Sequence, residues 1–133
     1  MSNSLRVLIV DDDAVDRQAA HRALLASDLD VEVAEADRGA EALDRLTSEG
    51  FDAVLLDLQI PDGDGLEILR EMQARSIATP IIMLTGHGDE MVAVEMMKAG
   101  AADYLSKAKL TPESLARTLR AAVRVGRAEM EAI

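Results

Sequence analysis

Cysteine is absent from the sequence, so neither a disulfide framework nor a thiolate site is available to this chain. Aromatic residues are almost as scarce, at 2% of the chain, and consist of Phe51 and Tyr104. Proteins that bind single-stranded nucleic acid commonly stack bases on aromatic rings, and this chain offers almost none. Its formal net charge of −11 also repels phosphate backbones and anionic lipid. We therefore expect no direct binding of nucleic acid and no membrane association.

Long apolar runs are missing as well. The longest ones, such as residues 7–10 and 81–84, are far shorter than the roughly 20 residues that a helix needs to cross a membrane. The first residues contain no basic segment followed by an apolar stretch, so no signal peptide is predicted. The sequence therefore indicates a cytoplasmic protein.

The chain is nevertheless long and apolar enough to build a core of its own. It has 133 residues, of which 49% are hydrophobic, and nearly all of these are aliphatic. This length favours a single domain that needs no cross-links. We expect one domain over residues 1–133, in which residues 126–133 are available as a helical linker to a further domain.

Strand-like and helix-like segments alternate along the sequence. Short aliphatic runs predict buried strands, and the segments between them show the apolar period of an amphipathic helix. Such alternation implies parallel strands joined by right-handed crossovers, with helices on both faces of the sheet. We therefore expect an α/β fold with a doubly wound, five-stranded parallel sheet. The predicted strands cover residues 5–10, 31–35, 53–57, 80–84 and 102–106, and the predicted helices cover residues 14–26, 39–48, 64–72, 89–99 and 112–125.

Residues that favour helix ends support these boundaries. Asp37 and Thr111 can each cap a helix, and a proline follows Thr111 at a preferred first-turn position. Asp64 and Glu67 have the spacing of a capping box, and Gly100 is expected to end the fourth helix. The apolar positions are Val15, Ala19, Ala23 and Leu24 in the first predicted helix and Leu115, Leu119, Ala122 and Val123 in the last.

Polar residues follow directly on four of the predicted strands. Three aspartates occupy positions 11–13, Asp57 ends the strand that breaks at Pro61 and Gly63, and Thr85 and Lys107 follow later strands. Because the carboxyl ends of parallel strands meet at one edge, where open α/β sheets bind their ligands, we expect these residues to converge.

This set of residues suits magnesium and a phosphoryl group. Carboxylates at one edge repel each other unless a cation lies among them, and magnesium takes one or two carboxylates while keeping waters that a phosphate can displace. Asp57 can serve as a nucleophile that forms an aspartyl phosphate. Lys107 and the Thr85 hydroxyl can contact the phosphoryl oxygens.

The four separated motifs, taken together, resemble those of response-regulator receiver domains, the CheY-like switches of two-component signalling. The resemblance extends from Leu5 to about Val125 and implies a flavodoxin-like strand order, 2-1-3-4-5. By this resemblance, Asp11 and Asp12 are the acidic pair that binds the metal, and Gln59 gives its backbone carbonyl to the same ion. Asp57 is the phosphoacceptor and a further metal ligand. Thr85 and Tyr104 form the switch, and Lys107 contacts the phosphoryl group.

The resemblance also implies cofactors and partners. Mg²⁺ is the expected ion, with Mn²⁺ as an alternative, and the phosphoryl donor would be a sensor histidine kinase or a phosphotransfer protein. The domain would catalyse its own phosphorylation and dephosphorylation without being an enzyme. Its output surface, formed by the fourth helix, the last strand and the last helix, would bind a partner or a second copy as a homodimer. Methionines at positions 91–97 and the arginines at 117, 120, 124 and 127 would contribute to that surface.

One position departs from the family pattern. Receiver domains usually have a proline after the lysine, in a cis peptide, whereas Ala108 follows Lys107 here. A cis bond costs about 2.5–4 kcal/mol for a residue other than proline. Either the bond is trans and the loop differs locally, or the loop carries strain.

Other interpretations account for some of the same residues. A pseudo-receiver would bind partners without phosphorylation, but it normally lacks the acids or the lysine. A haloacid-dehalogenase-type phosphohydrolase needs an acid two residues after its nucleophile, where this chain has Gln59. A calcium loop through Asp62 and Asp64 would have to start at Ile60. Asp13 is better placed to cap a helix than to bind metal, and His87 is more simply an exposed loop residue than a residue that controls water access.

Overall fold

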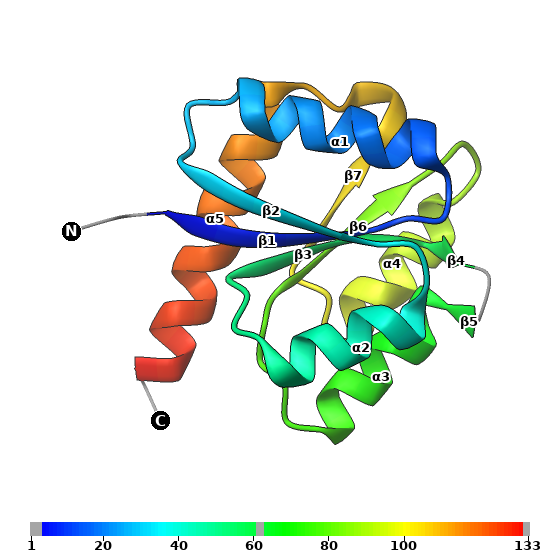
Figure 1. Cartoon of the computed structure of the whole chain (residues 1–133). Coiled ribbons are helices and arrows are strands. Elements are labelled where there is room, and N and C mark those ends of the chain that lie inside the picture. Colours follow the sequence, from blue (N-terminus) through cyan, green and yellow to red (C-terminus); the bar gives the residue numbers. More distant parts are fainter. Residues whose placement is uncertain (1–3, 61–62, 132–133) are drawn as a thin grey trace.

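The computed structural model describes residues 4–60 and 63–131, without the side chains of residues 129–131. Five parallel strands form one sheet in the order β2-β1-β3-β6-β7 (Figure 1). Numbered along the chain, this is the predicted order 2-1-3-4-5, so the fold class is confirmed. The strands are β1 (Leu5–Val10), β2 (Val31–Ala36), β3 (Ala53–Asp57), β6 (Ile81–Thr85) and β7 (Asp103–Ser106).

Five α-helices connect these strands: α1 (Ala14–Ala26), α2 (Gly39–Ser48), α3 (Gly65–Ala74), α4 (Glu90–Ala99) and α5 (Pro112–Glu131). Two shorter features were not predicted. Strands β4 (Gln59–Ile60) and β5 (Gly63–Asp64) pair antiparallel beyond the end of β3, and a 3₁₀ turn, η1, covers Lys107–Lys109. The predicted chain break at Pro61 and the predicted calcium ligand Asp62 lie outside the described residues.

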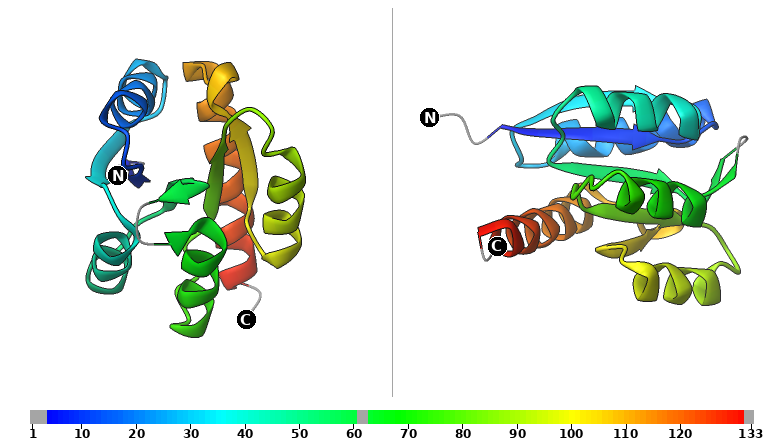
Figure 2. Two further views of the ribbon diagram at one scale, coloured as in Figure 1. Left: turned by 90° about the vertical axis from the view of Figure 1, so that its right-hand side faces the viewer. Right: turned by 90° about the horizontal axis from the view of Figure 1, so that it is seen from below.

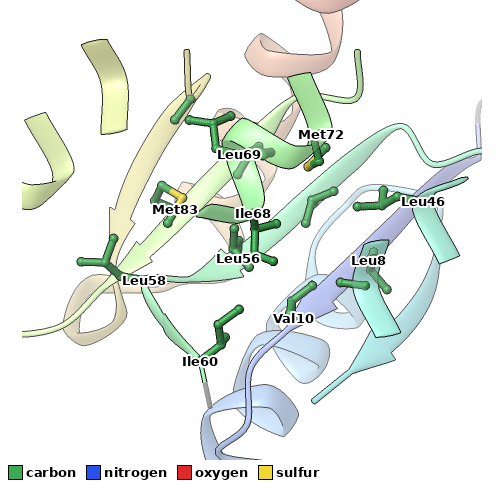
Figure 3. Close-up of a cluster of buried hydrophobic side chains, with 14 of the residues drawn as sticks. Leu8, Val10, Leu46, Leu56, Leu58, Ile60, Ile68, Leu69, Met72 and Met83 are labelled. Atoms are coloured by element: carbon green, nitrogen blue, oxygen red, sulfur yellow. The ribbon is translucent and has the colours of Figure 1, made fainter. Parts of the chain in front are cut away.

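The helices cover both faces of the sheet (Figure 2). Alternate residues of a central strand point to opposite faces, so Leu8 belongs to the core that α2, α3 and α4 cover, while Val7 belongs to the core that α1 and α5 cover. Figure 3 shows the first of these cores, in which Leu56 and Met83 meet Ile68 of α3. Both cores are aliphatic, as the composition requires, and together they fix the strands that lead to the sheet edge.

Most of the predicted helix ends are confirmed. Asp64 accepts a hydrogen bond from the Glu67 amide at 2.9 Å, and Thr111 accepts one from the Ser114 amide at 3.0 Å. Gly100 caps α4 with a φ of 120°, in the region that favours glycine.

One cap prediction is wrong, and the apolar positions predicted for α1 are only partly buried. The N-cap of α2 is Arg38 and not Asp37, and Arg38 makes no side-chain cap bond because its guanidinium has no hydrogen-bond acceptor for the helix amides. In α1 the buried residues are Ala20 and Leu24, while Val15 is exposed.

Helix α5 carries the predicted buried stripe and extends further than the sheet requires. Leu115, Leu119, Ala122 and Val123 are all buried. Residues 126–131 continue the helix to Glu131, and their role as a linker stays a prediction. In the described part of the chain, none of the helices combines the length and apolarity that a membrane span needs.

The end of α3 closes with a Schellman motif. The Ile77 amide donates to the Met72 carbonyl at 2.9 Å, and the Ser76 amide donates to the Gln73 carbonyl at 3.1 Å. Ser76 has a φ of 57° and is the only residue other than glycine with a positive φ in the described ranges. The motif normally has glycine at this position, since a β-carbon is unfavourable in the left-handed region.

Ser76→Gly should therefore raise the free energy of unfolding by roughly 0.5–1 kcal/mol, after the greater freedom of glycine in the unfolded chain is allowed for. Urea denaturation measures the change. Gly100→Ala is the converse control, because a β-carbon there would lie 2.6 Å from Gln73 Nε2 on a backbone with a φ of +120°. The urea midpoint of this variant should therefore fall. A lower midpoint for Ser76→Gly would contradict this account.

A polar network ties α1 to the edge strand β2. The Arg17 guanidinium donates to Glu35 Oε1 at 2.6 Å and to the Asp11 backbone carbonyl at 2.8 Å, while His21 Nδ1 lies 2.6 Å from Glu35 Oε2. Burial alone would raise the pKa of Glu35, but the hydrogen bonds from His21 and Arg17 outweigh burial, so the pKa lies below its ordinary value. The network thereby fixes the backbone at the end of β1.

Glu35→Gln should lower the free energy of unfolding by about 1 kcal/mol at pH 7. A depressed pKa means that the ionised carboxylate stabilises the fold above its unfolded pKa, and that this stability is lost as the pH falls through the folded value. The difference in the free energy of unfolding between parent and variant should therefore shrink as the pH is lowered from about 5 to about 3. Thermal unfolding across this range tests it, with Glu95→Gln, an exposed position of α4, as the control. A difference that does not change with pH would count against the ionic contribution.

Candidate functional site

Three aspartate carboxylates meet at the carboxyl edge of the sheet. Asp11 and Asp12 follow β1, and Asp57 ends β3, which pairs with β1. One oxygen from each carboxylate lies within 4.8 Å of those of the other two. Asp11 is fully buried, the Asp57 side chain is 13% exposed and Asp12 is exposed. The convergence predicted for these residues is therefore present.

Lys107 enters the same cluster from the end of β7. Its ammonium lies 3.0 Å from Asp11 Oδ2 and 3.3 Å from Asp57 Oδ1. The described peptide bonds are all trans, and the Ala108 amide donates to Ser106 Oγ at 3.3 Å as the chain turns into η1. Of the two alternatives for this loop, the trans bond with a different local turn is the one observed, and the lysine still reaches the carboxylates.

The close carboxylates alter one another's ionisation. Burial and the neighbouring charge of Asp11 raise the pKa of Asp57 to about 6, although Lys107 acts in the opposite direction. Burial alone would lower the pKa of Lys107, but the surrounding carboxylates of Asp16, Asp11 and Asp57 outweigh burial and raise it. The Lys107 side chain therefore stays protonated, within a site that still has an excess of negative charge.

The site fits a divalent cation. Asp11 Oδ2 is buried and accepts no hydrogen bond from the described residues, even though Lys107 lies at ion-pair distance. An unsatisfied buried carboxylate oxygen is costly, and an oxygen-ligated ion such as Mg²⁺ would relieve that cost. Asp11, Asp12 and Asp57 are the residues that would hold it. The backbone amide of Gln59 is 3.5 Å from Asp57 Oδ1, which puts this residue beside the cluster. That its backbone carbonyl binds the metal stays a prediction.

Thr85 and Tyr104 lie on the paired strands β6 and β7. Thr85 ends β6, is buried, and donates its hydroxyl hydrogen to the Leu105 carbonyl at 3.3 Å. Tyr104 lies on β7, pairs in register with Met83, and is 44% exposed. The two residues thus lie on neighbouring strands, with the threonine hydroxyl bonded to β7 and the tyrosine ring partly in solvent.

Three residues that the sequence reasoning did not select also form part of this edge. Asp16 contacts Lys107 at 2.9 Å, Arg17 holds the Asp11 carbonyl, and Asp89 accepts a hydrogen bond from the Gly86 amide at 2.8 Å. Asp16 could have been placed near this edge from the sequence, because it lies in the first turn of the helix that directly follows Asp11 and Asp12. A contact with a residue 91 positions later has no signal in a single sequence.

An open cavity of about 580 Å³ exposes the cluster to solvent. Its walls come from the β1–α1 turn, the start of β4, the β6–α4 loop and Lys107. His87 lines this cavity and is exposed, so its side chain can contact a ligand that enters the cavity. Asp13 and Asp64 cap α1 and α3 respectively, which agrees with the capping role expected for Asp13 and leaves the proposed calcium loop without support.

Comparison with known proteins agrees with this geometry. A family model described as "Response regulator receiver domain" matches residues 7–120. "Response regulator MprA" of Mycobacterium tuberculosis (strain ATCC 25618 / H37Rv) is 40% identical over 121 residues, which are 91% of this chain and 51% of that protein. "Response regulator MprA" of Mycobacterium avium (strain 104) is 38% identical over 128 residues, which are 96% of this chain and 55% of that protein. The chain spans about half the length of these relatives.

Solved structures agree as well. A response regulator receiver domain protein from Clostridium thermocellum is 30% identical with a TM-score of 0.82, covering 92% of this chain and 97% of that one. Full-length FixJ from B. japonicum is 34% identical with a TM-score of 0.86, covering 96% of this chain and 63% of that one. With the sheet order, the strand-end aspartates and the lysine described above, these matches show that the chain belongs to the response regulator receiver domain family.

Proposed function

We propose that this domain is a phosphorylation-driven switch in which Asp57 accepts a phosphoryl group. The observation that carries the proposal is the position of Asp57 at the end of β3, within 4.8 Å of oxygens from Asp11 and Asp12 and 3.3 Å from the Lys107 ammonium. Phosphoryl transfer depends mainly on positioning and on neutralising charge, and this arrangement offers both.

The residues divide the work between them. Asp11, Asp12, Asp57 and the Gln59 carbonyl would hold Mg²⁺ or Mn²⁺, which when bound neutralises the carboxylates and the phosphoryl oxygens. An Asp57 oxygen attacks phosphorus, the bond from phosphorus to the donor nitrogen breaks, and the nitrogen keeps the electron pair. Lys107 then neutralises a phosphoryl oxygen that the ion does not reach.

The donor would be a phosphohistidine on a sensor histidine kinase or on a phosphotransfer protein, and the reaction would take place in the cytoplasm. The open cavity of about 580 Å³ supports a protein donor, because its mouth lies in reach of a side chain from another molecule. Residues 126–133 would connect the switch to a further domain. Full-length FixJ and the MprA proteins are longer than this chain, which supports such an arrangement.

Asp57→Asn should abolish the incorporation of phosphate from a small phosphodonor such as acetyl phosphate in the presence of Mg²⁺, because the amide lacks the nucleophilic oxygen. Intact-mass spectrometry detects the adduct, and chelation of the ion should prevent it in the parent. Asp64→Asn is the matched control, since asparagine also caps a helix and this residue lies outside the carboxylate cluster.

Equal labelling of the parent and Asp57→Asn would show that the phosphoacceptor is another residue. An unlabelled parent, with a kinase partner as well as with the small donor, would favour the pseudo-receiver.

The output surface would be formed by α4, β7 and α5. Met91 and Val94 of α4 are exposed, and so is the Tyr104 ring of β7. A phosphoryl group on Asp57 would draw the Thr85 hydroxyl away from the Leu105 carbonyl and leave space into which the Tyr104 ring can turn. The surface would then differ between the two states, which a partner or a second copy needs in order to read the signal.

Three of the four α5 arginines that were expected at this surface lie elsewhere, while the contribution of Arg117 stays a prediction. Arg120, Arg124 and Arg127 line a groove with Asp28 and Asp30 at the opposite edge of the sheet. Arg120 pairs with Asp28 at 2.6 Å, and Arg127 lies 3.4 Å from Asp52. Their face of α5 turns toward β1, so the output surface would depend on apolar contact from α4 instead.

Binding of a partner, or self-association, should therefore change on addition of beryllofluoride and Mg²⁺ in the parent, and less in Thr85→Ala and Tyr104→Ala. The mechanism is differential affinity between the two states, which the threonine and tyrosine changes would reduce. Sedimentation and titration calorimetry measure it, with Leu25→Ala as the control, since this exposed apolar residue lies near the end of α1, outside the proposed surface. If the parent and both switch variants respond alike, this surface does not carry the signal, although Asp57 can still be the phosphoacceptor.

A further inference from the structure

Asp16 gives Lys107 a partner outside the proposed metal cluster. It lies in the first turn of α1, and its Oδ2 accepts a hydrogen bond from Lys107 Nζ at 2.9 Å. The contacts of the same ammonium with Asp11 and Asp57 are 3.0 and 3.3 Å, and Asp11 Oδ2 accepts no hydrogen bond from it. The ammonium is thus shared among three carboxylates, its shortest contact is with Asp16 of α1, and its longest is with the proposed phosphoacceptor.

The Asp16 side chain is well suited to a reversible contact. It is 42% exposed, so releasing the lysine leaves the carboxylate in water and not stranded in the core. Lys107 is 24% exposed and follows a turn held by the Ser106 hydroxyl, so the ammonium can move on its long stem while the backbone stays fixed. The ion pair is therefore short, and neither partner is locked in place by burial.

A phosphoryl group on Asp57 would compete with Asp16 for the same ammonium. The group brings about two negative charges and three acceptor oxygens next to the lysine. To contact those oxygens, Lys107 has to shift from Asp16 toward Asp57, and the hydrogen bond of 2.9 Å would be weakened or lost. The energy of that pair then counts against the phosphorylated state.

We propose that Asp16 is a restraining counter-ion, which holds Lys107 in a resting position and competes for it with the phosphoryl group on Asp57. This proposal rests on the function proposed above. Its consequence is that Asp16 sets how readily the domain enters the phosphorylated state, in opposition to the role of Lys107.

The main test is the affinity of the Mg²⁺-loaded protein for beryllofluoride, a mimic of the phosphoryl group. Asp16→Asn keeps the size of the side chain and a hydrogen-bond acceptor but removes its charge. Because a partly exposed ion pair is worth a modest free energy, the variant should bind beryllofluoride about two- to fivefold more tightly. Titration followed by heteronuclear NMR measures the affinity.

Asp13→Asn is the matched control. It removes one negative charge three residues earlier at the same helix start, where asparagine caps as well as aspartate, and the Asp13 side chain bonds the amides of Val15 and Asp16 rather than Lys107. An equal gain in both variants would reduce the effect to general electrostatics and overturn the proposal. Weaker binding in Asp16→Asn would make Asp16 a helper of Lys107, which also overturns it.

A second measurement needs neither phosphoryl mimic nor metal. In ion-free protein with isotopically labelled lysine, the side-chain resonances of Lys107 should move in Asp16→Asn and stay near the parent values in Asp13→Asn. Unmoved resonances in Asp16→Asn would show that the pair does not form in solution.

If the parent binds no beryllofluoride, the proposed function fails together with this inference. If the parent binds it and the two variants behave alike, this inference alone fails.

Discussion

The mutual repulsion of the strand-end carboxylates is the constraint around which this structure is arranged. Asp11, Asp12 and Asp57 are held close together because β1 and β3 are buried on both faces by aliphatic side chains. The free energy of burying these chains, about 25 cal/mol per Å² of apolar surface, holds the charges where they oppose one another. A site of this kind has stored electrostatic free energy that a cation or a change in charge can release.

The surrounding polar contacts adjust this repulsion from outside the cluster. Arg17 donates to the backbone carbonyl of Asp11 and not to its carboxylate. That carboxylate accepts a hydrogen bond from the Asp13 amide, and Lys107 compensates part of its charge. One positive side chain among several acids leaves an excess of negative charge, which a divalent ion can neutralise. The same excess explains why a cation shared among several carboxylates can be redistributed when one of them is modified.

Much of this arrangement could be predicted from the sequence, since period and strand-end position are local properties. The strand order was predicted from the family resemblance. The convergence of Asp57 with Lys107 was predicted from the rule that the carboxyl ends of parallel strands meet at one edge. Contacts between distant segments were not predictable. The Asp16 pair, the β4–β5 pairing and the direction of the α5 arginines depend on how helices rotate and loops close, which a hydrophobic pattern does not specify.

The scarcity of aromatic residues has a spectroscopic consequence. The chain has no tryptophan, and its one tyrosine is the half-exposed Tyr104 on β7. Its intrinsic fluorescence therefore comes almost wholly from one ring beside the proposed switch, with a weak contribution from Phe51, which lies under Arg6 at the other edge of the sheet. Quenching of that emission by a dissolved ion reads the exposure of one side chain. The protein thus contains a native optical probe at a single position, and no label is needed to follow it.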